Sequence, residues 1–276
     1  MIKKKLLIVT QDLDPYTALS EIAEFASKLP LYASEQGMEL RILMPRFGVI
    51  NERRHRLHEV VRLSGMNIIV DDDDFPLIIK VASLPGSRMQ VYFLDNDEFF
   101  RRKAAFEDEE GNLFPDNPDR MAFFCKGVIE TVKKFGWAPD IIHCHGWMTS
   151  LVPFYMKTAY KTEPLFQHSK VVYSVYDNKE SVSPEDFMTK ASINNLKAED
   201  LQAFLHNGEV LPHLGAVTYA DAVIRGSETM SDIVGEAIAR LEKPFLDIGG
   251  GHERATLSAY TKFYNELLAS DETPAE

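Results

Sequence analysis

Two histidines and a cysteine stand next to one another at residues 143 to 145, in the stretch DIIHCHGWMTS. Side chains alternate along a β-strand, so His143 and His145 would share one face of a strand while Cys144 points to the other. Two histidines on one face could begin a zinc site, but zinc usually takes three or four protein ligands, and no second Cys or His pair follows at ligand spacing. A cysteine nucleophile needs a histidine within hydrogen-bond reach, which strand neighbours do not provide. We therefore expect a packed, hydrogen-bonded histidine pair beneath a ligand cleft, and no metal site.

Three other stretches contain residue types that bind ions or phosphates. Asp71 to Asp74 could hold a divalent cation, although a run of aspartates is more often a solvated turn. The stretch DIGGGHE (247–253) is rich in glycine, but no strand is predicted before it, as a dinucleotide-binding loop requires, so we interpret it as a connection. In RGSET, Ser227 could cap a helix whose free N–H groups hold a phosphate or a carboxylate, and ordinary capping accounts for the same residues.

The composition narrows the class of protein. The chain has 276 residues, 45% of them hydrophobic, and a formal net charge of -12, which argues against nucleic acid or an anionic membrane as a partner. Only two cysteines occur and they form no CxxC pair, so a reducing compartment fits. The apolar run near the start covers only residues 6–9, too short for an export signal, and no run approaches the roughly 20 apolar residues of a membrane span. We expect a cytoplasmic protein without a cofactor.

Short apolar runs alternate with helical patterns along the chain, which is typical of a parallel sheet covered by helices. Strands are expected at 5–10, 39–45, 140–145 and 170–176 and within DAVIR. Leu19, Ile22, Ala23, Ala26 and Leu29 predict a helix after the first strand, capped by Asp14-Pro15 or by Thr17. Further helical patterns cover 121–135, 147–157, 197–208 and 255–269, with another after RGSET.

Residues 60–94 contain several strand-like runs separated by turn signals, including VVRLSG (60–65). They predict a small β-meander inserted into or edging the main sheet. The fold class predicted is therefore α/β: a single Rossmann-like, doubly wound, mainly parallel sheet with a β-meander insertion. We expect one domain over residues 1–270 and a frayed tail over 271–276.

Several segments resemble the bacterial glycogen and starch synthases that use ADP-glucose. PDIIHCHGWMTSLVPFYMK resembles that family's PDIVHAHDWQTALVPLYLK, LFPDNPDRMAFFCKGVIE resembles YPDNAERFAFFCRAALE, and TYADAVIRGSETMSDI resembles YADHITAVSPTYAREI. The resemblance implies one half of the two-domain GT-B architecture. It runs from residue 1 to about 238 and covers the family's N-terminal half. The C-terminal half, which holds most of the sugar-nucleotide donor and a catalytic Arg/Lys pair, has no counterpart in these residues.

Three positions depart from the family where its chemistry is located. The family's KxGGL, whose glycines admit the donor phosphates to a helix N-terminus, corresponds to Ala18-Leu19-Ser20-Glu21-Ile22, and Glu21 would repel a diphosphate. The aspartate of the family's HDW falls on Gly146. The histidine of the family's TVHN, which touches the reacting sugar, is replaced by Tyr176. Losing one such electrostatic contact typically costs about 3 kcal/mol of transition-state stabilisation.

These departures favour a half-domain without autonomous glycosyl transfer that acts as a glucan- or partner-binding module. We assign no catalytic residue. The residues expected to line a remodelled binding cleft are His145, Trp147, Tyr176, Asp177, Asn178 and Ser227. Tyrosine and tryptophan stack on sugar rings, so the expected ligand is a glucan or an ADP-sugar. The face left open by the missing half fits a homodimer or a partner subunit.

Two alternatives remain open. One is an active ADP-glucose:glucan glucosyltransferase that another chain completes. The other is an unrelated acid–base chemistry in which Tyr176, Asp177 and the histidine pair take part. A strongly shifted pKa for His145 or Asp177 inside a cleft would point to the latter.

Overall fold

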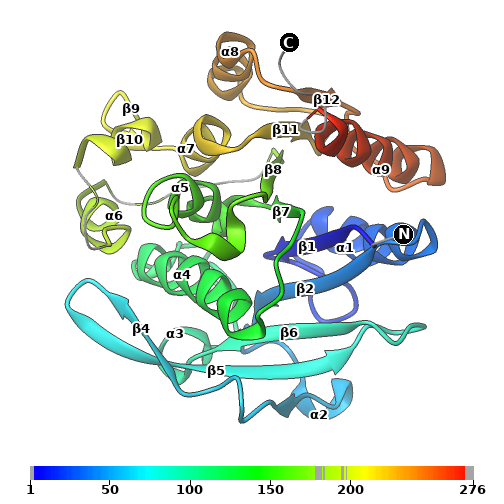
Figure 1. Cartoon of the computed structure of the whole chain (residues 1–276). Coiled ribbons are helices and arrows are strands. Elements are labelled where there is room, and N and C mark those ends of the chain that lie inside the picture. The colour runs from blue at the N-terminus through cyan, green and yellow to red at the C-terminus, as the bar shows by residue number, and fades with distance from the viewer. Residues whose placement is uncertain (1–2, 178–181, 183, 194–195, 197, 271–276) are drawn as a thin grey trace.

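One large sheet runs through the computed structural model, which describes residues 3–177, 182, 184–193, 196 and 198–270 (Figure 1). Its strand order is β12-β11-β8-β7-β1-β2-β6-β5-β3, with β4 paired to β5. The strands from β12 to β6 are parallel, whereas β3, β4 and β5 pair antiparallel. The predicted Rossmann-like, mainly parallel sheet with a β-meander at its edge is thus confirmed.

The bounds of the elements follow the apolar runs closely. The strands of the large sheet are β1 (Lys5–Thr10), β2 (Glu39–Pro45), β3 (His58–Glu59), β4 (Met66–Val70), β5 (Asp73–Ser83), β6 (Gln90–Asp95), β7 (Ile141–His145), β8 (Lys170–Val175), β11 (Ala222–Arg225) and β12 (Phe245–Asp247). A small hairpin is formed by β9 (Leu205–His206) and β10 (Glu209–Val210). The α-helices are α1 (Ile22–Glu35), α2 (Glu52–His55), α3 (Asp97–Phe100), α4 (Asn117–Phe135), α5 (Leu151–Lys157), α6 (Pro184–Lys190), α7 (Pro212–Tyr219), α8 (Asp232–Leu241) and α9 (Arg254–Ala269). Three short 3-10 helices are η1 (Trp147–Thr149), η2 (Pro164–Phe166) and η3 (Ala198–Phe204).

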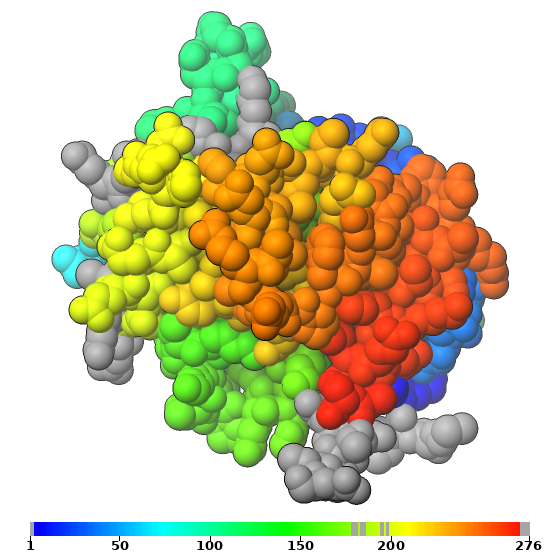
Figure 2. All heavy atoms as spheres, turned by 90° about the horizontal axis from the view of Figure 1, so that it is seen from above, coloured from blue at the N-terminus to red at the C-terminus, as the bar shows by residue number. Residues whose placement is uncertain are grey.

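Helices cover both faces of the sheet. In Figure 1, α1 and α9 lie together on one side, and α4, α5 and α7 lie on the other. The C-terminal helices close the β12 end of the sheet, where Figure 2 shows α8 in orange beside α9 in red. Because each central strand is covered on both faces, its side chains are buried almost without alternation, as in β7.

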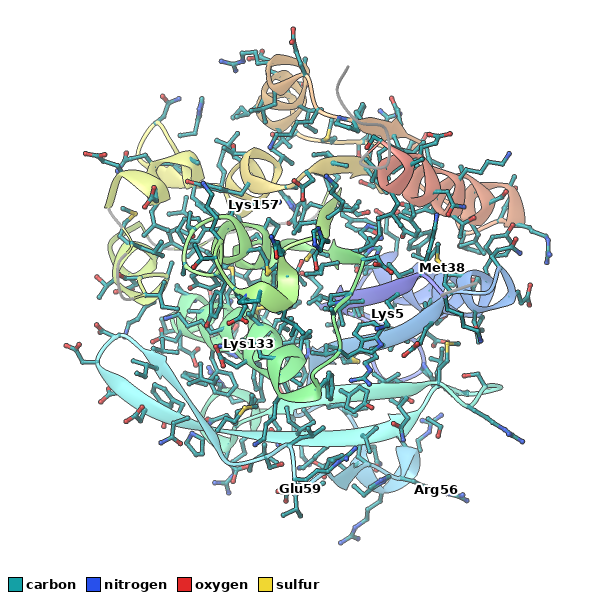
Figure 3. All side chains as sticks on the ribbon, viewed as in Figure 1. Lys5, Met38, Arg56, Glu59, Lys133 and Lys157 are labelled. Atoms are coloured by element: carbon teal, nitrogen blue, oxygen red, sulfur yellow. The ribbon has the colours of Figure 1, made fainter. Side chains whose placement is uncertain are left out.

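The two edges of the sheet differ in what they offer a ligand. Figure 3 labels residues of the edge where strands begin and helices end, such as Lys5 at the start of β1 and Lys157 at the end of α5. The Lys5 N–H donates to Asp140 at 2.6 Å, and the Lys157 Nζ donates to Asp221 at 2.7 Å, which ties this edge together. The opposite edge, where the parallel strands end, is the place at which open α/β sheets bind ligands.

Three expected elements differ from the structure. Helix α1 begins at Ile22, so Asp14, Pro15 and Thr17 do not cap it, and Leu19 lies before it with 43% of its surface exposed. Residues 60–65 form a turn rather than a strand, although β4, β5 and β6 confirm the rest of the meander.

Of the helix expected over 197–208, the described residues are helical from 198 to 204, as a 3-10 helix, and not from 205 to 208. Asn207 and Gly208 adopt positive φ values of 50° and 83° and turn the chain into the β9–β10 hairpin. The frayed tail predicted for 271–276 lies outside the described residues. No helix in the described part of the chain is long and apolar enough to cross a membrane.

Candidate functional site

The histidine pair lies at the carboxyl end of β7 and is completely buried. The two rings share one face of the strand, with centroids 3.8 Å apart. His143 Nε2 lies 2.7 Å from Ser174 Oγ, and His143 Nδ1 lies 2.6 Å from the Tyr264 hydroxyl. His145 Nδ1 lies 2.9 Å from the Tyr176 hydroxyl. The prediction of a packed, hydrogen-bonded pair is confirmed.

Burial fixes the protonation state of these side chains. It lowers the pKa of His145 to about 3 and the pKa of His143 well below its ordinary value, with the neighbouring His145 adding to the second shift. On the other face of β7, burial raises the pKa of Cys144 well above its ordinary value, so its thiol carries no thiolate at neutral pH. The site therefore has neutral imidazoles and no activated sulfur. Among the described residues, no group of three or more His, Cys, Asp or Glu side chains is placed to hold a metal ion.

Two tyrosines of α9 cover the histidine pair. The Tyr264 hydroxyl bonds to His143, and the Tyr260 ring lies 4.6 Å from Phe25 and 5.7 Å from His143. Both rings are buried. They stand four residues apart, so they share one face of the helix. Their spacing was visible in the sequence, but nothing in the sequence alone assigned this face to the strand end.

Asp12, in the loop after β1, organises the chain before α1. Its Oδ2 accepts the N–H groups of Leu19 at 2.8 Å and Ser20 at 2.7 Å, and its carboxylate also accepts the Thr17 hydroxyl. The carboxylate is buried, and burial raises its pKa above the ordinary value against the lowering effect of these hydrogen bonds. The internal carboxylate thus occupies N–H groups that an external anion would need. Sequence reasoning missed Asp12, because a lone aspartate after a strand gives no distinctive pattern.

Gly146 lies beside Gln11 at the end of β7. Its φ is +86°, and a Cβ atom at this position would lie 2.4 Å from the Gln11 Oε1. The Gln11 Oε1 accepts the N–H of Met148 at 3.0 Å, which holds the amide side chain in place. The space next to Gly146 is therefore filled by Gln11, another residue that sequence reasoning missed.

Two carboxylates lie close enough to interact where β8 ends and α1 begins. The pKa of Glu21 is raised by partial burial and by the charge of Asp177. Asp177 is exposed; its N–H donates to Ser227 Oγ at 2.8 Å, and its carboxylate accepts the Thr229 hydroxyl. We call the edge of the sheet at which the parallel strands end the carboxyl edge. At these two residues it presents negative charge to solvent.

Ser227 has a different role from the expected helix cap. Helix α8 begins only at Asp232, with Ser231 before it, so Ser227 does not cap the helix. Its hydroxyl donates to the carbonyl of Thr229 at 2.8 Å and accepts the N–H of Asp177, which braces the ends of β8 and β11. The expected helix cap at Ser227, on which both the ordinary-capping and the phosphate-binding interpretations depended, is therefore wrong.

Of the six predicted binding residues, four lie close together. His145, Tyr176, Asp177 and Ser227 meet at the carboxyl ends of β7, β8 and β11. Trp147 is buried and packs on Phe106, with ring centroids 4.9 Å apart. Asn178 lies outside the described residues.

The glycine-rich stretch 247–253 joins a strand to a helix, contrary to expectation. Strand β12 precedes it and α9 follows it, and Gly249, Gly250 and Gly251 all have positive φ. A Cβ on Gly250 would lie 3.3 Å from the Gly226 carbonyl oxygen, so the loop packs on the end of β11. A three-residue strand is too short for a periodic signal, and its pairing with β11 defines it.

The chain is similar to known proteins over most of its length. Residues 5–243 match the family model described as the starch synthase catalytic domain. The glycogen synthase of Pelodictyon phaeoclathratiforme is 34% identical over 231 residues, covering 83% of this chain and 46% of the relative. The glycogen synthase of Chlorobium limicola is 36% identical over 236 residues, covering 82% of this chain and 48% of the relative. The chain thus spans about half the length of the curated relatives it matches.

A solved structure shares the fold. The catalytic domain of starch synthase IV from Arabidopsis thaliana, bound to ADP and acarbose, superimposes with a TM-score of 0.72. The match covers 91% of this chain and 52% of that one, at 18% sequence identity. The described elements therefore correspond to one half of a two-part architecture.

Proposed function

The chain belongs to the family of starch synthase catalytic domains, and from that premise we propose that it is a glycogen/starch synthase-like half-domain that binds glucan and does not transfer glucose on its own. The observation that carries the proposal is the nearness of two like charges at the carboxyl edge, where the charge of Asp177 raises the pKa of Glu21. Glu21 and Asp177 both lie within residues 5–243, which match the family model.

Negative charge at this edge disfavours a nucleotide-sugar donor. A diphosphate would meet the Glu21 and Asp177 carboxylates, and like charges repel. The N–H groups of Leu19 and Ser20, which precede α1, already donate to Asp12. A helix N-terminus binds anions through free N–H groups, and in this loop two of them are satisfied internally.

The same carboxylates suit a neutral ligand with many hydroxyl groups. An ionised carboxylate offers only acceptors, and sugar hydroxyls can donate to both of its oxygens. The exposed Asp177 is braced by Ser227 and Thr229, so its position is held before a ligand arrives. A glucan is accordingly a better match than ADP-glucose for the acidic edge.

Gly146 supports the absence of autonomous transfer. The family resemblance places a catalytic-cleft aspartate at this position, and here Gln11 fills the space where any side chain at residue 146 would begin. The missing carboxylate is therefore accompanied by a neighbour, Gln11, that fills its space. Both Cys125 and Cys144 are free and buried, which fits the cytoplasmic location that we propose.

Calorimetry and saturation-transfer NMR on the full chain test the proposal, with maltoheptaose, ADP and ADP-glucose as separate ligands. We expect saturable binding of maltoheptaose, no comparable binding of ADP-glucose, and no glucosyl transfer to the glucan. The variant Asp177→Asn should weaken maltoheptaose binding, while Glu59→Gln, a change of an exposed carboxylate on β3, should leave it unchanged. Binding of ADP-glucose tighter than that of maltoheptaose, or glucosyl transfer by this chain, would refute the proposal. Transfer only after another chain is added would instead support an enzyme completed by a partner.

A further inference from the structure

One face of β5 stays partly open at the outer end of the sheet. Side chains alternate along a strand, so Asp74, Pro76, Ile78 and Lys80 share this face, and none of them is buried. The short helix α2 lies on the same face, where Glu52 accepts a hydrogen bond from the Lys80 Nζ at 2.7 Å. Figure 1 shows α2 beside β5. We call this face of β5, together with α2, the outer face.

An acidic hollow of about 610 Å³ lies at one end of the outer face. The described residues that line it are Asp73, Asp74, Phe75, Pro76, Ile78, Asn96, Asp97 and Glu98. Four of these are exposed carboxylates and none is a cation. Arg46 approaches Asp97 to 3.9 Å, which leaves most of the negative charge of the hollow uncompensated.

A basic patch lies at the other end of the outer face. It consists of exposed arginines on α2 and in the turns that follow α2 and β3: Arg53, Arg54, Arg56 and Arg62. In the described part of the chain none of the four forms an ion pair. The pKa of His55 is lowered by partial burial and further by the charge of Arg54. Figure 3 labels Arg56 at the rim of the molecule beside Glu59, an exposed carboxylate that offsets only part of this positive charge.

The charges between these two ends balance one another. The Asp95 carboxylate lies 2.9 Å from the Arg46 Nη2 and 2.9 Å from the Lys80 Nζ, and Glu52 contacts both cations as well. Two cations thus face two carboxylates. This network supplies little countercharge to the acidic hollow or to the basic patch, so each end keeps its own excess of charge.

Exposed apolar side chains accompany both charged ends. Val61, next to Arg62, has 78% of its surface exposed, and Ile69 of β4 has 53%. Ile69 lies directly opposite Asp74 in the β4–β5 pair, so both side chains are on the same side of the pair. Exposed ion pairs alone contribute little to association, so a stable contact needs apolar burial of this kind as well.

We propose that the outer face is the interface of a two-fold symmetric homodimer, in which the basic patch of each copy lies against the acidic hollow of the other. A surface with a positive and a negative end is complementary to itself, because a two-fold rotation exchanges the ends. Asp74 and Lys80 lie about 20 Å apart along β5. An interface of standard size, about 800 Å² per copy, is about 30 Å across, so one interface can include both ends.

The formal net charge of -12 permits this contact at moderate salt. At about 0.1 M salt the Debye length is about 10 Å, so the acidic groups outside the interface are largely screened, whereas the facing ends are in contact. The outer face shares no residue with the predicted binding cleft. The homodimer is therefore independent of the proposed glucan binding.

Sedimentation equilibrium of the full chain tests the proposal. We expect a monomer–dimer equilibrium with a Kd of about 10 µM or tighter in about 0.1 M NaCl. In about 1 M NaCl, where the Debye length falls to about 3 Å, dimerisation should be weaker by at least about tenfold.

Charge reversal at either end should separate the copies. Arg53→Glu/Arg54→Glu and, in a second protein, Asp73→Lys/Asp74→Lys should each weaken dimerisation by at least about tenfold. All four side chains are exposed, so the changes leave the core intact. The two variants mixed in equal amounts should form a heterodimer, because opposite charges then meet at both contacts.

Arg240→Glu/Lys262→Glu is the matched control. It makes the same change of net charge as the reversed basic patch, at exposed positions of α8 and α9, and should leave the dimer intact. Four results would each overturn the proposal. They are a monomer at concentrations up to about 100 µM in about 0.1 M NaCl, unweakened dimerisation of Arg53→Glu/Arg54→Glu, no association in the mixture of reversed variants, and an equal loss in the control.

Discussion

Gln11 occupies the space into which a side chain at residue 146 would extend. Gly146 has a φ of +86°, and the nearest atoms to a Cβ built there are the Oε1 and Cδ of Gln11, both at 2.4 Å. Residues 11 and 146 are neighbours only because β1 and β7 pair in parallel, with Thr10 opposite His145. The absence of a side chain at residue 146 and the position of Gln11 therefore depend on each other.

Introducing an aspartate by Gly146→Asp should destabilise the protein. The new Cβ would collide with Gln11, and an L-residue at this φ is strained, so we expect a loss of about 2–4 kcal/mol in the free energy of unfolding. Urea denaturation followed by circular dichroism measures it. The double variant Gln11→Ala/Gly146→Asp should lose less than the sum of the two single variants, because the collision is removed. Additive losses would show that the two positions are not coupled.

Acidification should destabilise the chain through its buried histidines. The folded-state pKa of His143 and His145 lies below the unfolded value of about 6.5, at about 3 for His145, and His213 is shifted to about 3 as well. The unfolded chain therefore binds more protons between these values, so stability is complete above about pH 6.5 and is lost as the pH falls toward 3. Each histidine contributes a slope of up to about 1.4 kcal/mol per pH unit. The raised pKa values of Asp12 and Glu21 act in the opposite direction and offset part of it.

Urea denaturation at pH 7.5, 6 and 5 measures this dependence. His145→Gln should reduce the slope, while His168→Gln, a change of an exposed histidine, should not. Equal stability at pH 7.5 and 5 would contradict the neutral, buried state of the pair.

Tyr264→Phe should destabilise the chain modestly. The change deletes the hydroxyl 2.6 Å from His143 Nδ1 and leaves a buried ring nitrogen without that partner, which typically costs about 1–3 kcal/mol. Tyr32→Phe on α1, whose ring is only partly buried, serves as the control in the same denaturation experiment. Equal stability of the two variants would mean that α9 is held without this hydrogen bond.

The central strands were predictable because they are buried on both faces. KLLIVT and ELRILMP have the bounds of β1 and β2 residue for residue, since a parallel strand under helices gives a continuous apolar run. The shared face of His143 and His145 followed from strand alternation alone. These are local properties, so they can be read without knowing the tertiary structure.

The organisation of the carboxyl edge was not predictable in the same way. The Asp12 carboxylate accepts the N–H groups of Leu19 and Ser20, and α1 begins only after these residues. The apolar pattern includes Leu19 and therefore predicts an earlier start of the helix. Strand β12 is defined by its pairing with β11, because its own three residues are too few to show a periodic pattern. The departure from the family pattern at Gly146 was visible in the sequence, but Gln11, which fills its space, directly follows β1 and lies more than one hundred residues away along the chain.

The interaction between Glu21 and Asp177 yields the most direct test of the acidic edge. Because the charge of Asp177 raises the pKa of Glu21, Asp177→Asn should lower the pKa of Glu21, which carbon-detected NMR of the labelled carboxyl groups measures. Glu59→Gln should leave it unchanged, since this carboxylate lies on β3 at the other end of the sheet. Glu21→Lys should in addition strengthen the binding of ADP by about tenfold or more, because attraction replaces repulsion at one position. An unchanged Glu21 pKa in Asp177→Asn would mean that burial alone sets it. The two carboxylates would then not act together on a ligand at this edge.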